Sequence, residues 1–256
     1  MNVPKGRGAL AREKERRGEI KFEIVANHGT RKDLEYLTAM KNIVSKHLPN
    51  MALDYISRIV YDIAYHESLL MIETKSNNLL GGICFRPFPD RGFVEIVFCA
   101  IDITQQYQGY GSYLMQHFKK EMNKRAIYHI LTYADNHAME YFIKQGFRKN
   151  ITLAKEMWGG YIKDYVAATL MECVLHKNVS DYTNVPATVK KQQECIQQLI
   201  NEVSHSQIFK GLDVFKNGAK KIDIKDIPGV TEADLLLENQ PENNLNFIPI
   251  EKKEGK

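Results

Sequence analysis

The sequence predicts an α+β fold with a mixed, mostly antiparallel sheet flanked by helices. Residues 31–48 and 51–60 repeat apolar side chains every three or four positions, which is typical of two helices. Three strand-like runs follow over residues 69–101, and helical and strand patterns then alternate over residues 112–175. A helical pair, a run of hairpins and then alternation is the order of an α+β domain, and 256 residues with 44% hydrophobic side chains can bury its core.

The first half of the chain supplies the predicted helical pair and a meander of strands. Residues 19–25 alternate apolar and charged side chains, which predicts a half-buried strand. Thr30, with Asp33 three residues later, marks the start of a helix that Pro49 ends. The meander consists of three strands and two turn-rich connections, over residues 69–74, 75–78, 79–88, 89–92 and 93–101.

The second half predicts a helix after residue 112, a strand over 128–134, a helix over 136–145 and a last strand over 169–175. Pro186 then opens a helix in which Val189, Ile196 and Val203 recur every seven residues, with Leu199 between them. This repeat is too short for an independent coiled coil. The apolar stripe packs either on its own domain or on a partner helix.

Composition excludes several classes of protein. The four cysteines have no paired short spacing, so we expect no metal site and no disulfide framework. The apolar stretches are far shorter than a membrane span and the N-terminus lacks a secretory apolar region, so we expect no membrane contact.

The net charge of +4 comes from residues 1–18, which hold six Lys or Arg against two Glu. We expect a basic, disordered tail there, with a weak nucleic-acid contact or a nuclear address as the alternative. The acidic, asparagine-rich residues 231–256 have no clear periodicity and are predicted to form a second tail.

A glycine-rich loop over residues 106–112 is the main functional signal. Gly109 and Gly111 stand where a strand gives way to a helix, so the backbone can direct several N–H groups at one anion, and we expect a pyrophosphate. Leu114 occupies the place of the third small residue of a dinucleotide fingerprint, and no Gly-Lys-Ser/Thr for a nucleoside triphosphate follows. An ordinary turn before a helix is the competing interpretation.

The loop reads Gln-x-x-Gly-x-Gly, and with its surroundings it resembles the PCAF-like histone acetyltransferases of the GNAT superfamily, the catalytic subunits of SAGA-type coactivator complexes. The matching segments are residues 81–86, 95–100, 131–135, 145–147, 160–165 and 169–173. The resemblance extends from about residue 20 to about residue 230. It implies a GNAT domain over residues 19–178, acetyl-CoA as cosubstrate, a nuclear location and a helical adaptor-binding segment over residues 185–230, with no bromodomain in this chain.

Glu95 is the predicted general base. A lysine amine with a pKa of about 10.4 is about one part in a thousand neutral near pH 7.4, so attack on a thioester requires removal of its proton. The strand places Glu95 among apolar residues, with Phe93, Val97 and Cys99 on its own face, and desolvation should raise its pKa. The resemblance assigns the same role, whereas a solvent-facing or salt-bridged glutamate is the structural alternative.

The resemblance also implies the residues that bind acetyl-CoA. Backbone contacts with the acetyl and pantetheine parts are expected from Cys99, Ala100 and Ile101. The pyrophosphate is expected to lie against Gln106, Tyr107, Gln108, Gly109, Tyr110, Gly111 and Ser112. The pantetheine arm near the sulfur is expected to meet His137, Ala138 and Tyr141.

Several of these assignments carry conditions. Tyr141 is also a candidate to protonate the leaving thiolate, or it is a packing residue. Gln108 departs from close relatives, which usually carry Lys or Arg there, so the loop would bind through N–H groups and the helix dipole alone. Cys99 as a covalent nucleophile is disfavoured, because no histidine is placed by the sequence to activate it. The peptide groove is expected from residues 51–56 and 157–165, with Tyr133 nearby.

The sequence thus predicts a nuclear histone lysine acetyltransferase and coactivator that works by direct attack in a ternary complex, mainly on histone H3 tails. Its expected partners are a histone tail peptide and the adaptor subunit of a SAGA-type complex, with weak or no direct DNA binding. Two alternatives stay open: a catalytically silent module that binds CoA, and an acetyltransferase for small or other non-histone amines.

Overall fold

The structure is a computed structural model that describes residues 8–179, 182–183, 185–204, 209, 212–218 and 221–230. The chain divides into two units, residues 1–190 and residues 191–256. The predicted acidic tail over residues 231–256 lies outside the described residues.

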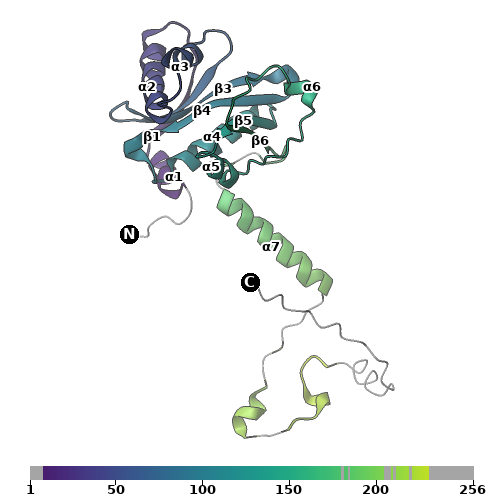
Figure 1. The fold of residues 1–256 in the computed structure, drawn as a ribbon. Coiled ribbons are helices and arrows are strands. Elements are labelled where there is room, and N and C mark those ends of the chain that lie inside the picture. Colours follow the sequence, from purple (N-terminus) through teal and green to yellow (C-terminus); the bar gives the residue numbers. More distant parts are fainter. Residues whose placement is uncertain are drawn as a thin grey trace, which may run out of the picture. The chain divides into compact units, whose positions relative to one another are not determined.

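One six-stranded sheet organises the first unit, and its strands lie side by side in chain order (Figure 1). They are β1 (Ile20–Val25), β2 (Glu67–Glu73), β3 (Leu79–Phe88), β4 (Phe93–Ile101), β5 (His129–Asp135) and β6 (Ala168–Val174). All neighbours run antiparallel except β4 and β5, which are parallel. The predicted meander and the mostly antiparallel sheet are therefore confirmed.

Helices cover both faces of the sheet. One face packs against α2 (Arg31–His47) and α3 (Leu53–Val60), and the other against α4 (Tyr110–Lys124) and α5 (Met139–Lys144) (Figure 1). Thr30 starts α2 as predicted, because its hydroxyl accepts the N–H of Asp33. The remaining helical elements are α1 (Ala9–Arg16), α6 (Lys155–Trp158), α7 (Val185–Ser204) and the short turns η1 (Pro89–Arg91), η2 (Ile103–Gln105), η3 (Asp213–Asn217) and η4 (Ile224–Asp226).

A β-bulge at Val97 changes which face of the sheet β4 presents. Phe85 of β3 pairs with Ile96, but its neighbour Cys84 pairs with Phe98, so Val97 is an extra residue. Ile96 consequently belongs to the core under α4, and Phe98 to the core under α2. The prediction that Glu95 and Cys99 share a face is wrong, because the bulge resets the alternation and Cys99 packs against the core under α4.

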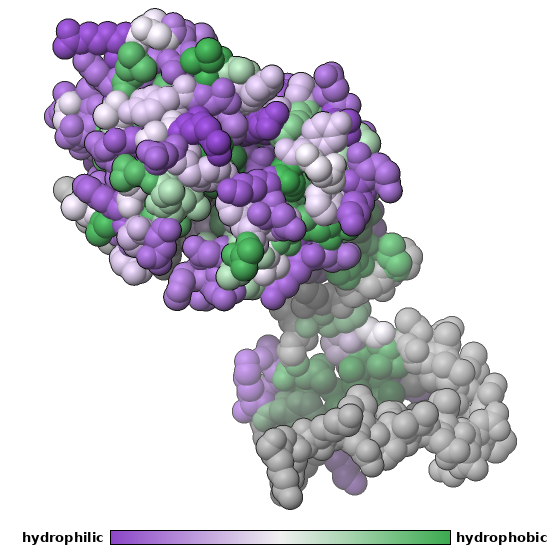
Figure 2. Space-filling model, turned by 45° about the horizontal axis from the view of Figure 1, so that its top comes forward, coloured by the Kyte–Doolittle hydropathy of each residue, from purple (hydrophilic) through white to green (hydrophobic). Residues whose placement is uncertain are grey.

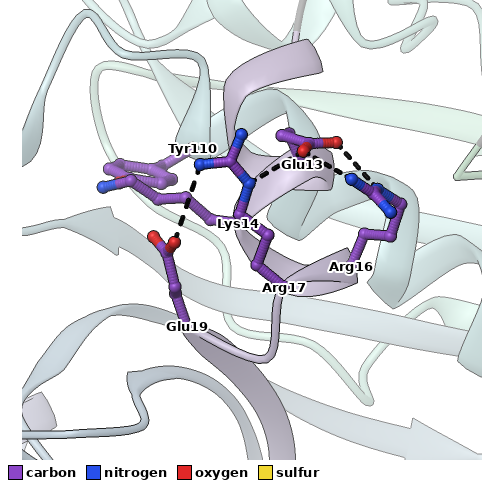
Figure 3. A network of polar contacts seen from close by, with 6 residues as sticks. All are labelled: Glu13, Lys14, Arg16, Arg17, Glu19 and Tyr110. Carbon is purple, nitrogen blue, oxygen red and sulfur yellow. Dashed lines mark hydrogen bonds and ion pairs between the residues drawn. The ribbon is translucent and has the colours of Figure 1, made fainter.

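The prediction of a disordered tail over residues 1–18 is wrong for Ala9–Arg16, which form α1. Ala11 is 0% exposed in the core under α4. Lys14 Nζ donates a hydrogen bond of 2.5 Å to the hydroxyl of Tyr110, so α1 is tied to the start of α4. Of the charges that suggested a solvated arm, Glu13 pairs with Arg16 and Arg17 (Figure 3), and Glu15 bonds to α4.

The surface of the first unit is polar where Figure 2 shows it, with hydrophobic residues scattered among hydrophilic ones. None of the described helices is both long and apolar enough to cross a membrane.

Candidate active site

Strands β4 and β5 part in the middle of the sheet. They pair only over residues 93–96 of β4 and 129–132 of β5, although β4 continues to Ile101. Asp102 N–H donates to Leu80 O at 2.8 Å, which fixes the hydrogen-bond alternation of the β3–β4 ladder. The N–H and C=O groups of Ala100 therefore point toward β3, and those of Cys99 and Ile101 point into the opening.

This alternation separates the three predicted backbone contacts. It favours Cys99 and Ile101 as donors or acceptors for a ligand that runs along β4, and it assigns the backbone of Ala100 to the sheet. The carbonyl of Ile101 already bonds to Nε2 of His47 at 2.6 Å. The N–H of Ile101 and both backbone groups of Cys99 therefore face the opening and have no partner in the β3–β4 ladder.

The glycine loop ends at the N-terminus of α4. Gly109 is the N-cap with φ of 81°, a left-handed conformation that glycine adopts without strain. The first N–H groups of α4 have no intrahelical acceptor, and they lie at the positive end of the helix dipole, so this terminus suits an anion. Gln108 donates to Gln105 Oε1 at 3.3 Å and adds an amide rather than a cation.

The loop, β4 and α5 meet at Gly111. Tyr141 donates its hydroxyl to Gly111 O at 2.9 Å and lies 3.8 Å from Cys99 Sγ. A side chain at Gly111 would contact Tyr141 at 3.4 Å and Ile101 at 3.6 Å. Four of the predicted cofactor residues thus converge on one place.

The other predicted cofactor residues on this side differ in how firmly their neighbours hold them. Ala138 packs against the core under α4. It is the N-cap of α5, and its N–H donates to Oδ1 of Asp135, the last residue of β5, at 2.7 Å. Ser112 accepts a hydrogen bond from Gln145 at 3.0 Å, which ties the loop to the end of α5. His137 is exposed, and Tyr107 has a fully exposed side chain. These two therefore gain no support from packing within the chain.

Glu95 lies on the face of the sheet that carries α2 and α3, just before the bulge. Its side chain is 7% exposed, and no described residue forms a hydrogen bond or ion pair with its carboxylate. Burial raises the pKa of Glu95 to about 7, while the charge of Arg86 opposes the rise. The raised pKa agrees with the desolvation predicted from the apolar strand.

Aromatic side chains from three elements gather near Glu95. Tyr55 of α3 and Tyr165 hydrogen-bond through their hydroxyls, and the ring of Tyr133 lies 5.6 Å from that of Tyr165. The charge of Glu95 helps to raise the pKa of Tyr133 and of Tyr165, although burial is the main cause for both. Lys163 Nζ lies 4.2 Å from the Tyr55 ring. The two segments predicted to form the groove therefore lie together beside Glu95.

Arg86 was not singled out from the sequence. It is the cross-strand partner of Glu95, a pairing that follows from counting back across the turn over residues 89–92. Within the part of the chain that the structure describes, no group of three His, Cys, Asp or Glu is arranged to hold a metal ion.

Known proteins resemble this chain in sequence and fold. The acetyltransferase (GNAT) family model matches residues 37–147. The histone acetyltransferase GCN5 of Yarrowia lipolytica is 43% identical over 221 residues, which are 86% of this chain and 47% of that protein. The chain spans about half the length of the curated relatives it matches.

Solved structures support the same relationship. The crystal structure of Tetrahymena GCN5 is 44% identical with a TM-score of 0.60, over 62% of this chain and 99% of that one. The catalytic domain of Tetrahymena GCN5 in complex with coenzyme A is 45% identical with a TM-score of 0.53, over 64% of this chain and 98% of that one. The chain, with its GNAT fold, belongs to the GCN5 histone acetyltransferases of the GNAT family.

Proposed function

We propose that this chain transfers the acetyl group of acetyl-CoA to lysine side chains of histone tails, by direct attack within a ternary complex. The observation that supports this most is the buried, unpaired carboxylate of Glu95, which lies on β4 just before the point where β4 and β5 part. The relatives named as GCN5 histone acetyltransferases and the structure of one with coenzyme A support the same activity.

Glu95 would remove the proton from the substrate lysine. Near pH 7.4 the protonated lysine is favoured by about 4 kcal/mol, and only the neutral amine can attack. With a pKa of about 7, Glu95 is largely ionised at that pH and is still basic enough to accept a proton. Its carboxylate has no described hydrogen-bond donor to compete with the incoming amine.

The opening between β4 and β5 suits the extended pantetheine arm. Acetyl-CoA would lie along β4, with its amides on the backbone groups of Cys99 and Ile101 and its diphosphate on the N–H groups at the start of α4. Attack of the amine on the thioester carbonyl forms the amide and breaks the C–S bond. The bound cosubstrate supplies the activated acetyl group, and the chain supplies the base and the orientation.

Tyr141 and Cys99 have clear limits to their chemistry. Burial raises the pKa of Tyr141 well above its ordinary value, so its hydroxyl stays protonated, and to donate to a leaving thiolate it would have to give up its bond to Gly111 O. Burial also raises the pKa of Cys99 to about 11, so it remains a thiol at neutral pH. A thiol is a poor nucleophile, which favours direct transfer over an acyl-enzyme.

A peptide suits the site better than a small amine. Tyr55 on α3 and Tyr165 in the loop before β6 bond to each other through their hydroxyls near Glu95, so the acceptor would lie along this pair, where two separate chain segments offer contacts to a peptide. We infer a histone tail of the H3 type as substrate, and a nuclear location follows from that substrate. The intact carboxylate of Glu95 argues against a catalytically silent module.

Helix α7 is the proposed binding segment for an adaptor subunit of a SAGA-type complex. Its stripe of apolar side chains is between 43% and 81% exposed and consists of Val189, Ile196, Leu199, Ile200 and Val203. An exposed apolar stripe on a 20-residue helix is suited to packing against a partner helix. Such a partner would give the chain its coactivator role.

The adaptor proposal is tested by charge substitution on α7. Ile196→Asp with Leu199→Asp should abolish capture of a purified adaptor subunit and leave the melting temperature and free-peptide acetylation nearly unchanged. Gln198→Asp with Asn201→Asp adds the same charge on the opposite side of α7 and should preserve capture. A large loss of stability in the first variant would indicate self-packing instead.

The activity is tested by transfer of radiolabelled acetyl to a histone mixture and to a panel of small amines. Label in histones, lost in Glu95→Gln, supports the proposal. Label mainly in small amines contradicts the substrate class. No label in any acceptor, with CoA still bound in calorimetry, supports the silent module.

A further inference from the structure

We infer that Arg86 is a positioning residue for the proposed transfer. Two aromatic rings hold its guanidinium beside Glu95, and the guanidinium and the carboxylate form no ion pair. This placement sets the pH at which Glu95 works as a base. This inference rests on the proposed function. Arg86 and Glu95 are direct cross-strand partners on β3 and β4. Both side chains lie on the face that carries α2 and α3, and partners of this kind have Cβ atoms about 5 Å apart.

The guanidinium is held by rings instead of by the carboxylate. Its central carbon lies 4.7 Å from the ring centre of Tyr65 and 4.6 Å from that of Phe88. Phe88 is itself stacked on Phe93 at 4.5 Å, so one side of this sandwich is anchored in the sheet. Among the described residues, none accepts a hydrogen bond from Arg86.

This arrangement has an electrostatic consequence. A full ion pair with an arginine would lower the pKa of a carboxylate by about one to three, and Glu95 would then be a weak base. Without any nearby cation, burial alone would raise the pKa further and leave the base protonated at neutral pH. A guanidinium that is near but not bonded gives an intermediate value, consistent with a pKa of about 7.

The other groups near Glu95 do not account for this charge. Two further cations, Lys163 and Arg58, lie 4.2 Å and 5.3 Å from the ring centre of Tyr55, and the lowering of the Glu95 pKa is not attributed to either. Burial raises the pKa values of Tyr133, Tyr165 and Cys84, so all three are neutral at physiological pH. Burial and the charge of Arg86 lower the pKa of His66, which bonds to Asp62. Arg86 is the group to which the lowering of the Glu95 pKa is attributed.

The test measures the pKa of Glu95 directly. The full chain is labelled with ¹³C at glutamate carboxyl groups, and the Glu95 signal is assigned by its loss in Glu95→Gln. Arg86→Gln should raise this pKa by about 0.5 to 1 and lower the acetylation rate at pH 6.5 about three- to eightfold, with the rate above pH 8.5 within about twofold of wild type.

Two further variants separate charge from packing. Arg86→Lys keeps the positive charge and should not raise the pKa of Glu95. Tyr65→Leu removes one of the two rings, at a residue that is 62% exposed. It should lower the pKa of Glu95, because the guanidinium of Arg86 would be free to bond to the Glu95 carboxylate. Arg91→Gln is the control. Arg91 also lies over a ring, that of Tyr161 at 3.5 Å, but it belongs to the turn η1 and not to a strand facing Glu95. Its loss should leave the pKa of Glu95 unchanged.

An unchanged Glu95 pKa in Arg86→Gln would overturn the inference. A raised pKa in Tyr65→Leu would also overturn it, because the rings would then be attracting the guanidinium toward Glu95 and not restraining it. The proposed function fails separately: if wild type transfers no acetyl group, the signal of Glu95 still reports whether Arg86 sets its pKa.

Discussion

Replacing Glu95 with Gln should damage catalysis and stabilise the fold at the same time. Gln keeps the volume of the side chain but cannot take a proton. With a pKa of about 7, about three quarters of Glu95 is ionised at pH 7.5 and about one tenth at pH 6.0. The wild-type rate should therefore fall about eightfold between these pH values, and Glu95→Gln should be about 10²- to 10⁴-fold slower at pH 7.5.

The stability effect follows from the direction of the pKa change. Below pH 4.5, the ordinary value, Glu95 is protonated in both the folded and the unfolded chain. Between pH 4.5 and about 7 the unfolded chain ionises first, so the folded state loses stability as the pH rises, and above pH 7 the loss is constant. The raised pKa of Glu95 lowers the free energy of unfolding above pH 7 by about 3 kcal/mol at most.

The assay combines steady-state acetylation with thermal unfolding across pH 4 to 9. Glu95→Gln should melt at the same temperature as wild type near pH 4 and several degrees higher above pH 7, with acetyl-CoA affinity within a few-fold. Near-normal activity of the variant at neutral pH would refute the role of Glu95 as base. A difference in melting temperature that does not depend on pH would refute the buried, unpaired carboxylate.

Three further predictions concern the ligand sites. Gln108→Arg should tighten CoA binding by about 0.5 to 1 kcal/mol at low salt, with the gain lost as ionic strength rises; an unchanged dissociation constant in calorimetry would mean that residue 108 points away from the diphosphate. Gly81→Ala should destabilise the fold by about 1 to 3 kcal/mol in urea and weaken CoA binding, because its new carbon would lie 2.9 Å from Ile101 Cα, and unchanged values of both would contradict this contact. Tyr55→Phe should raise KM for a histone peptide severalfold with kcat nearly constant, since it loses the bond to Tyr165; an unaltered KM in peptide kinetics would exclude Tyr55 from the groove.

Much of the sheet could be predicted because its signals are local. Strands β3 and β4 have the predicted bounds, since turn-forming residues delimit both, and Thr30 starts its helix as expected. The burial of Glu95 could also be predicted, because a lone carboxylate in an apolar strand has little access to water wherever the strand packs centrally.

The rest depends on contacts between distant residues. The bulge at Val97 has no local signal, because a continuous apolar run looks the same with or without an extra residue. Helix α1 was missed because its buried side chains are alanines, whose burial depends on their packing against Tyr113 and its neighbours. The sandwich around Arg86 needs Tyr65, which lies in a loop whose position no periodicity predicts.

Helix α1 lies near the start of the chain, yet it holds α4, the helix that begins at the glycine loop. Lys14 bonds to Tyr110 across 96 residues, and Tyr113 donates to Glu15 across 98. During synthesis from the N-terminus, α1 leaves the ribosome long before its partners exist and can dock only after α4 has been made. A truncation at residue 18 would therefore remove contacts that hold α4 and weaken the support of the glycine loop without removing any residue of that loop.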